Sequence, residues 1–130
     1  MSKTFKIGES ILTLSIISDI IDCNKRLILD KTAKKNISDC RKFLDQDIAS
    51  LENPVYGINT GFGSLYNHKI DAKELNKLQE NLVLSHACGT GDLVPPNVVR
   101  IMMLLKIQSL SYGYSGVQLK TVQRLIDMFN

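Results

Sequence analysis

A glycine-rich segment with a single tyrosine, Pro54–Gly63, carries the residues of this chain best suited to chemistry. It reads Pro-Val-Tyr-Gly-Ile-Asn-Thr-Gly-Phe-Gly, so Tyr56 has Gly57, Gly61 and Gly63 close by in the sequence. Glycine permits tight turns and close approach of the backbone to a ligand, so this loop can present the phenol oxygen of Tyr56 to a pocket. A phenol oxygen acts as a base where positive surroundings, such as helix N-termini, favour its ionised form. The alternative, commoner on composition alone, is a tyrosine packed at a turn with its hydroxyl bonded to backbone.

His86 is the second candidate for a functional residue. It lies on the same face of an expected helix as Leu75 and Leu82. A lone histidine on an apolar stripe is usually a core residue whose ring nitrogens are satisfied. The functional alternative is a ligand contact at the end of the helix, where Gly89 and Gly91 let a partner approach.

The sequence does not favour a nucleotide-binding site, a zinc site or a disulfide framework. Neither the loop glycines nor Gly89-Thr-Gly91 form a nucleotide-binding pattern, which also requires a preceding strand and a helix that opens on the glycines. The three cysteines, Cys23, Cys40 and Cys88, are odd in number and widely spaced, which argues against zinc or a disulfide framework. We therefore expect no metal, and buried reduced thiols in a cytoplasmic protein.

Composition bounds the remaining classes of function. The 130 residues are 44% hydrophobic and 22% charged, typical of one globular domain at most. The net charge of +3 is mild, and no basic stripe carries interleaved aromatic residues, so nucleic-acid binding is not expected. The N-terminus lacks the apolar stretch of a signal peptide. No apolar run approaches the ~18 residues of a membrane span, so no membrane contact is expected.

The pattern predicts a mainly helical chain with a possible short two-stranded β ribbon near the N-terminus. Residues 4–7 and 26–29 read as the strands, and Thr13 is placed to cap a short helix between them. That helix carries one apolar side, and a longer helix with an apolar stripe at helical spacing follows it. Asp71 and Glu74 have capping-box spacing before the helix that holds His86. The residues expected on the apolar side of the short helix are Leu14, Ile17, Ile20 and Ile21. We expect the later helices to span about 31–50, 71–87 and 95–112, and a last helix to begin near 117.

The segment from Asn97 to Leu110 is apolar almost all round, which is typical of a helix in the middle of a large core. The other elements look too few to bury it, so we expect part of this helix to be unburied in a monomer. The apolar pattern of the last expected helix also continues up to Asn130, without a glycine or proline that would end it. Both observations predict that residues 1–130 are the N-terminal region of something larger. Assembly with other chains would explain the first observation equally well.

Three blocks of the sequence resemble the aromatic amino acid ammonia-lyases, and within that family the histidine ammonia-lyases most closely. Val55–Gly63 looks like the tyrosine loop of the family, and Leu78–Gly89 looks like the helix that follows it. Val99–Leu110 with Gly113–Gly116 looks like the next helix. The blocks appear in family order and together cover essentially the whole chain.

This resemblance implies an L-aspartase-like, mostly helical fold, a homotetramer, and elimination of ammonia from an aromatic amino acid. It implies acid–base work for Tyr56, a position near the substrate for Gly63, and a substrate-selecting position for His86. The pair Ser85-His86 is similar to histidine ammonia-lyases, which convert L-histidine to urocanate. The family's cofactor is methylidene-imidazolone (MIO), an electrophile formed from an internal Ala-Ser-Gly that traps the substrate and makes its β-hydrogen removable.

The chain departs from the family pattern in one respect, because its 130 residues contain no Ala-Ser-Gly triplet. In the family that triplet follows soon after the position of Asn130, so we expect these residues alone to be inactive. Two alternatives stay open. One is another MIO-dependent aromatic amino acid lyase or aminomutase. The other is a non-catalytic interaction module whose exposed helices bind a partner.

Overall fold

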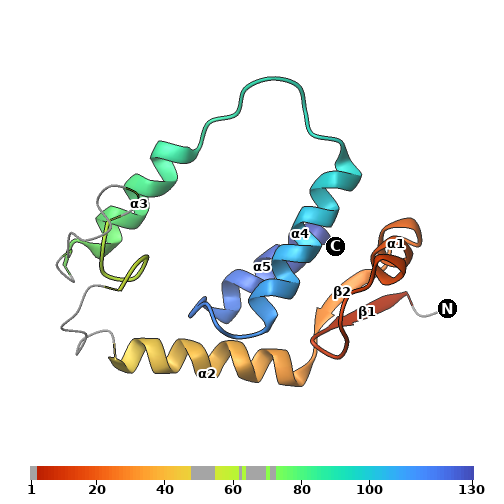
Figure 1. The fold of residues 1–130 in the computed structure, drawn as a ribbon, viewed down its shortest axis with the longest axis horizontal. Coiled ribbons are helices and arrows are strands. Elements are labelled where there is room, and N and C mark those ends of the chain that lie inside the picture. Colours follow the sequence, from red (N-terminus) through yellow and green to blue (C-terminus); the bar gives the residue numbers. More distant parts are fainter. Residues whose placement is uncertain (1–2, 48–54, 62, 64–69, 71–72) are drawn as a thin grey trace. The chain divides into compact units, whose positions relative to one another are not determined.

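The computed structural model describes residues 3–47, 55–61, 63, 70 and 73–130. Two compact units make up the chain: Met1–Leu44 together with Leu93–Asn130, and Asp45–Asp92. Figure 1 shows the elements in chain order, from red to blue. Their bounds are β1 Thr4–Ile7, α1 Leu14–Asp22, β2 Arg26–Leu29, α2 Lys31–Asp47, α3 Leu75–His86, α4 Pro96–Ser111 and α5 Leu119–Phe129.

The first unit begins with a β1–α1–β2 motif whose two strands pair in parallel, from Thr4 with Arg26 to Ile7 with Leu29. A parallel pair requires a crossover connection, and α1 provides it. The Thr13 side chain caps α1 by accepting a hydrogen bond from the backbone N–H of Ile16 at 3.3 Å. Both predicted strands and the predicted cap are therefore confirmed.

The core of this unit lies where α4 and α5 pack beside the strands and α2. The Asn130 side chain ties the end of α5 to β2. It accepts from the backbone N–H of Leu27 at 2.7 Å and donates to the carbonyl oxygen of the same residue at 2.9 Å. The buried apolar side chains are Ile7, Ile20, Ile21, Leu27, Leu29, Ala33, Ile37, Leu104, Ile107, Leu110, Val122, Ile126 and Phe129.

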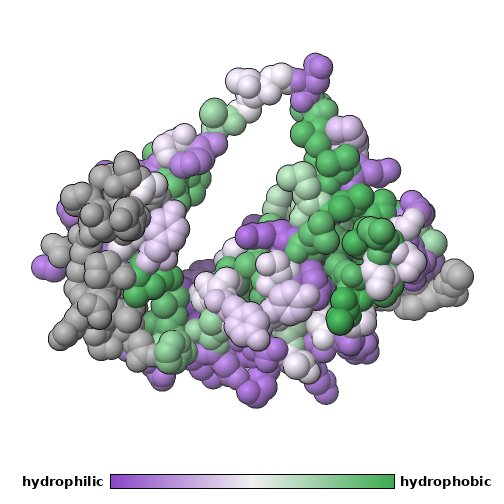
Figure 2. Space-filling model, in the orientation of Figure 1, coloured by the Kyte–Doolittle hydropathy of each residue, from purple (hydrophilic) through white to green (hydrophobic). Residues whose placement is uncertain are grey.

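Helix α4 buries only part of its apolar surface within this chain. Pro96 occupies its first turn, as predicted, and Leu104 and Ile107 are fully buried. Met102 and Leu105, by contrast, are 61% and 47% exposed. Figure 2 shows hydrophobic surface along this helix. The prediction that this helix is partly unburied is confirmed for the 130 residues.

Several predictions about burial and helix capping are wrong. Leu14 is 87% exposed and does not share the buried side of α1 with Ile20. Cys23 and Cys88 are exposed free thiols, not buried ones. Glu74 is the N-cap residue of α3 and makes no capping bond with its side chain, so it does not complete a capping box; Asp71 lies outside the described residues. Throughout the described part of the chain, the helices are too short or too polar to cross a bilayer.

Gly113 supports the turn that follows α4. Its φ is +77°, and an added Cβ would lie 2.6 Å from the backbone carbonyl of Asn36 in α2. We expect Gly113→Ala to destabilise the chain by at least about 1–3 kcal/mol, because a left-handed conformation strains any residue with a Cβ and the obstacle here is rigid backbone. Urea denaturation followed by circular dichroism measures this change. The matched control is Gly89→Ala, where a Cβ meets nothing within 4 Å and φ is not positive. Equal midpoints for the two variants would contradict the prediction.

Candidate active site

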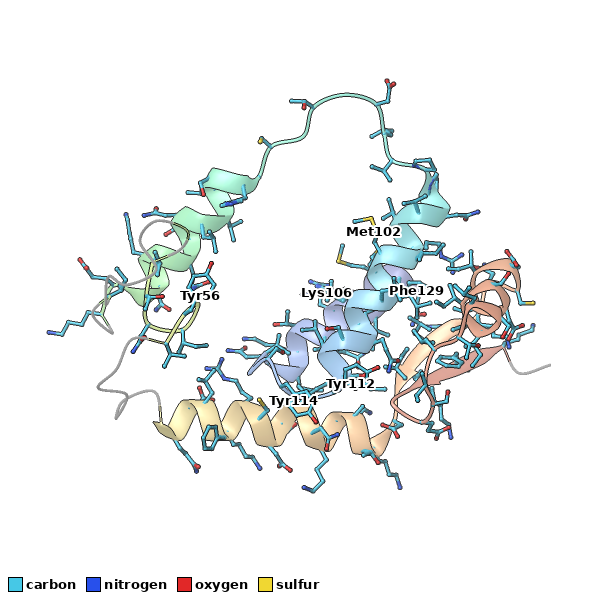
Figure 3. All side chains as sticks on the ribbon, in the orientation of Figure 1. Tyr56, Met102, Lys106, Tyr112, Tyr114 and Phe129 are labelled. Carbon is cyan, nitrogen blue, oxygen red and sulfur yellow. The ribbon has the colours of Figure 1, made fainter. Side chains whose placement is uncertain are left out.

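The second unit, Asp45–Asp92, contains all three residues predicted from the sequence to form the site. Tyr56 and Gly63 belong to the glycine loop, and His86 is the last residue of α3. Figure 3 labels Tyr56 on the loop. Their meeting at one substrate stays a prediction.

The loop begins with a hydrogen-bonded turn built around Asn59. The backbone N–H groups of Ile58 and Asn59 donate to the carbonyl oxygen of Val55 at 3.1 and 3.2 Å. The side-chain Oδ1 of Asn59 in turn accepts from the N–H of Val55 at 2.7 Å. Gly57 permits this path because its φ is +76°. Asn59 thus closes the turn from both backbone and side chain, and only 5% of it is exposed.

Tyr56 sits within this turn and is 63% exposed. More than half of the residue is therefore open to solvent. The turn that holds it is closed by the hydrogen bonds between Val55 and Asn59.

Asn59 is a residue whose role the sequence reasoning missed. Asparagine side chains often hydrogen-bond nearby backbone in turns, and Asn59 lies two residues after a glycine. The residue type and its spacing from Gly57 could have suggested that Asn59 closes a turn, but they could not identify the backbone N–H of Val55 as its partner.

We expect Asn59→Ala to loosen the turn without unfolding the chain. The Val55 N–H would lose its acceptor, and the loss of one part-buried neutral hydrogen bond costs about 0.5–1.5 kcal/mol, or roughly 2- to 10-fold in a local opening equilibrium. Amide hydrogen exchange at Val55 should accelerate by about that factor. Asn59→Asp is the control because it keeps an acceptor oxygen at this position. Unchanged exchange at Val55 in the alanine variant would show that the side-chain bond does not hold the turn.

The end of α3 presents His86 in an exposed position, so the interpretation as a core histidine is wrong for this chain. Val83 and Leu84 on the same helix are also 67% and 69% exposed. The helix stops at His86, and the N–H of Ala87 still bonds to the carbonyl of Val83 at 2.9 Å. Beyond it, a Cβ at Gly89 would meet nothing within 4 Å. The ring therefore stands at an open helix end.

The Nδ1 atom of His86 has two polar neighbours, and these also contact each other. The Nδ1 atom lies 2.9 Å from the Leu82 carbonyl oxygen and 2.9 Å from the Ser85 hydroxyl. The Ser85 hydroxyl itself donates to the same Leu82 carbonyl at 2.9 Å. The Nε2 atom lies on the other side of the ring from this cluster. Gly63 is exposed in its own loop, with φ +59° and no atom within 4 Å of an added Cβ.

A separate hollow, in the first unit, is lined by basic side chains. Lys25 there bonds Asp19 at 2.5 Å, which lowers the pKa of the Asp19 carboxyl. Bonding to Asp19 raises the pKa of the neighbouring Cys23 thiol, so less of it is present as the reactive thiolate. The lining residues are Lys3, Cys23, Asn24, Lys25, Arg26, Arg100, Phe129 and Asn130.

The helical fold, the tyrosine loop and the histidine at the end of α3 together match a known family. The family model for aromatic amino acid lyases matches residues 12–130, and the chain belongs to this family. Among its relatives is the histidine ammonia-lyase of Legionella pneumophila (strain Lens), which is 46% identical over an alignment that covers all of this chain and 26% of the relative.

Solved structures of aromatic amino acid lyases and aminomutases are also similar to this chain. The histidine ammonia-lyase of Trypanosoma cruzi has a TM-score of 0.78 and 29% identity, over 95% of this chain and 23% of the other. The phenylalanine aminomutase of Pantoea agglomerans has a TM-score of 0.85 and 26% identity, over 98% of this chain and 24% of the other. The chain spans about a quarter of the length of the relatives it matches. The mainly helical fold predicted from the sequence is therefore confirmed as that of this family.

Proposed function

We propose that these residues are the N-terminal part of a cytoplasmic histidine ammonia-lyase, which eliminates ammonia from L-histidine to give urocanate in histidine catabolism. The observation that carries the proposal is the 46% identity, over the full length of this chain, to the Legionella histidine ammonia-lyase. The Ser85-His86 pair supports the choice of histidine among aromatic substrates.

Each predicted site residue has a role in this proposal. Tyr56 moves a proton at its phenol oxygen, and the 63% exposure of the residue supports this role. His86 pairs with the imidazole of the substrate through a ring nitrogen. Gly63 keeps the loop free of a side chain close to the substrate; the absence of neighbours around it in this chain is consistent with such a space.

The family's MIO group would supply the electrophile that activates the substrate. Its Ala-Ser-Gly precursor is absent from these 130 residues, so they do not supply the group themselves. The residues described here are therefore assigned to binding the substrate and moving protons.

Assembly into a homo-oligomer, a tetramer in the complete enzyme, is part of the same proposal. The exposed apolar side chains of α4, among them Met102 and Leu105, support it. Such side chains are each worth roughly 1.5–3 kcal/mol when buried, which favours covering them with further protein.

The proposal is tested by expressing the whole reading frame that contains codons 1–130 and supplying L-histidine. Urocanate absorbance should rise with the longer protein and not with residues 1–130 alone. A reading frame that ends at codon 130, or a longer protein without urocanate production, would refute the proposal. The first result would favour a non-catalytic interaction module.

The second candidate is another MIO-dependent lyase or an aminomutase with a different aromatic substrate. The likeness to the Pantoea phenylalanine aminomutase favours it. A screen of phenylalanine, tyrosine and histidine separates the two candidates, because an aminomutase forms a β-amino acid from its substrate and histidine ammonia-lyase forms urocanate.

A further inference from the structure

We infer that Ser85 is a positioning residue for His86. With the Leu82 carbonyl, its hydroxyl holds the imidazole in the tautomer that carries hydrogen on Nδ1, so that Nε2 is left as a hydrogen-bond acceptor for a ligand N–H. The identity of that ligand, a substrate imidazole, rests on the proposed function. The tautomer itself does not.

The assignment follows from what each atom in the cluster can do. A carbonyl oxygen only accepts hydrogen bonds, so the Nδ1 atom 2.9 Å from the Leu82 oxygen must carry the hydrogen for this contact to be attractive. The opposite tautomer would bring a nitrogen lone pair against the carbonyl lone pairs. Which nitrogen of a histidine carries the hydrogen is commonly set by such a partner of the other nitrogen.

Ser85 completes the arrangement without conflict. Its hydroxyl hydrogen points to the Leu82 carbonyl at 2.9 Å, which leaves its oxygen lone pairs free to accept from Nδ1–H, also at 2.9 Å. The single hydrogen on Nδ1 is thus shared between two acceptors. An alanine at position 85 would leave only the carbonyl.

The consequence is directional recognition at the open end of α3. A neutral imidazole has one donor and one acceptor, so a ring whose Nδ1–H is engaged offers an acceptor at Nε2. A substrate ring that carries an N–H, such as imidazole, satisfies this acceptor. A five-membered ring of similar size without any N–H, such as furan, leaves it unpaired.

The chain permits a clean measurement of the tautomer because it contains only two histidines. In a His68→Gln background, ¹⁵N-histidine labelling reports on His86 alone. Long-range ¹H–¹⁵N correlation spectra at alkaline pH distinguish the tautomers, because the nitrogen without hydrogen resonates far downfield of the other. We expect the signal of Nε2 to be the downfield one in the 130-residue chain.

Variants at position 85 test the role of the serine. Ser85→Ala should lower the ratio of the Nδ1–H to the Nε2–H form by roughly 2- to 10-fold, the effect of one neutral hydrogen bond on an equilibrium. Ser85→Thr keeps the hydroxyl and should restore the wild-type ratio. Ser109→Ala, an exposed helical serine in α4, is the control for the substitution itself. A ring that is mainly Nε2–H in the wild type, or a ratio unchanged by Ser85→Ala, overturns the inference.

A kinetic measurement connects the tautomer to recognition. In the longer enzyme, kcat/KM for L-histidine relative to 3-(2-furyl)alanine should fall by the same roughly 2- to 10-fold in Ser85→Ala. The spectra require no substrate. The assignment of the His86 tautomer and the proposal that the enzyme acts on histidine can therefore be refuted independently. An Nδ1–H ring in an enzyme that does not act on histidine would refute the proposed function and support the tautomer assignment.

Discussion

Tyr56→Phe should lower kcat of the longer enzyme by about 10²–10⁴-fold, the usual contribution of a general acid or base, with the chain still folded. The substitution keeps the ring and deletes only the phenol oxygen. Because Tyr56 is 63% exposed and the ring is retained, the substitution removes little packing. The turn that carries the residue is closed by Asn59 and Val55, which the variant retains. Single-turnover and steady-state rates, with a thermal melt, measure both expectations.

Tyr114→Phe is the matched control, since Tyr114 is 91% exposed and lies in the other unit of the chain. It removes the same atom without touching the glycine loop. Unchanged kcat in Tyr56→Phe, or a large fall in its melting temperature, would assign Tyr56 a structural role.

His86→Leu should reduce kcat/KM for L-histidine by roughly tenfold to a hundredfold or more. A hydrocarbon at this position leaves the polar nitrogens of the substrate unpaired, which costs about 1–3 kcal/mol for each buried group. With Ser85→Phe added, preference should move toward phenylalanine. Since His86 is exposed at the end of α3, the melting temperature of the chain should change little.

His86→Gln is the control, because an amide keeps both a donor and an acceptor at this position. It should retain more of the activity with histidine than His86→Leu does. The measurement is kcat/KM for histidine and for phenylalanine in each variant. A constant ratio between the two substrates across all variants would remove the main residue-level support for histidine as the substrate.

Local patterns explain why much of the fold was predictable. Thr13 caps α1 through a bond to a backbone N–H only three residues away. Pro96 begins α4 because a first-turn proline loses no intrahelical bond. The stripe through Ala33 and Ile37 repeats at helical spacing, and both side chains are buried. Interactions of this kind are encoded within a few residues of the sequence.

Burial was less predictable, because periodicity identifies a face and not the element that covers it. Leu14 shares the apolar pattern of α1 but is exposed, whereas Ile20 of the same helix is fully buried. Cys23 was expected to be buried as an unpaired thiol, and it lies at the exposed end of α1 beside Asp19.

The sequence alone determined the helical class, the position of both strands and the family resemblance carried by the tyrosine loop and the Ser85-His86 pair. These features depend on residue types and on short spacings. Tertiary structure decided the parallel direction of the strands and the bonds between Asn130 and Leu27, which lie 103 residues apart. It also showed the Nδ1 side of His86 occupied by Leu82 and Ser85, since hydrogen bonding at a ring nitrogen depends on a rotamer and a helix end that no residue pattern specifies.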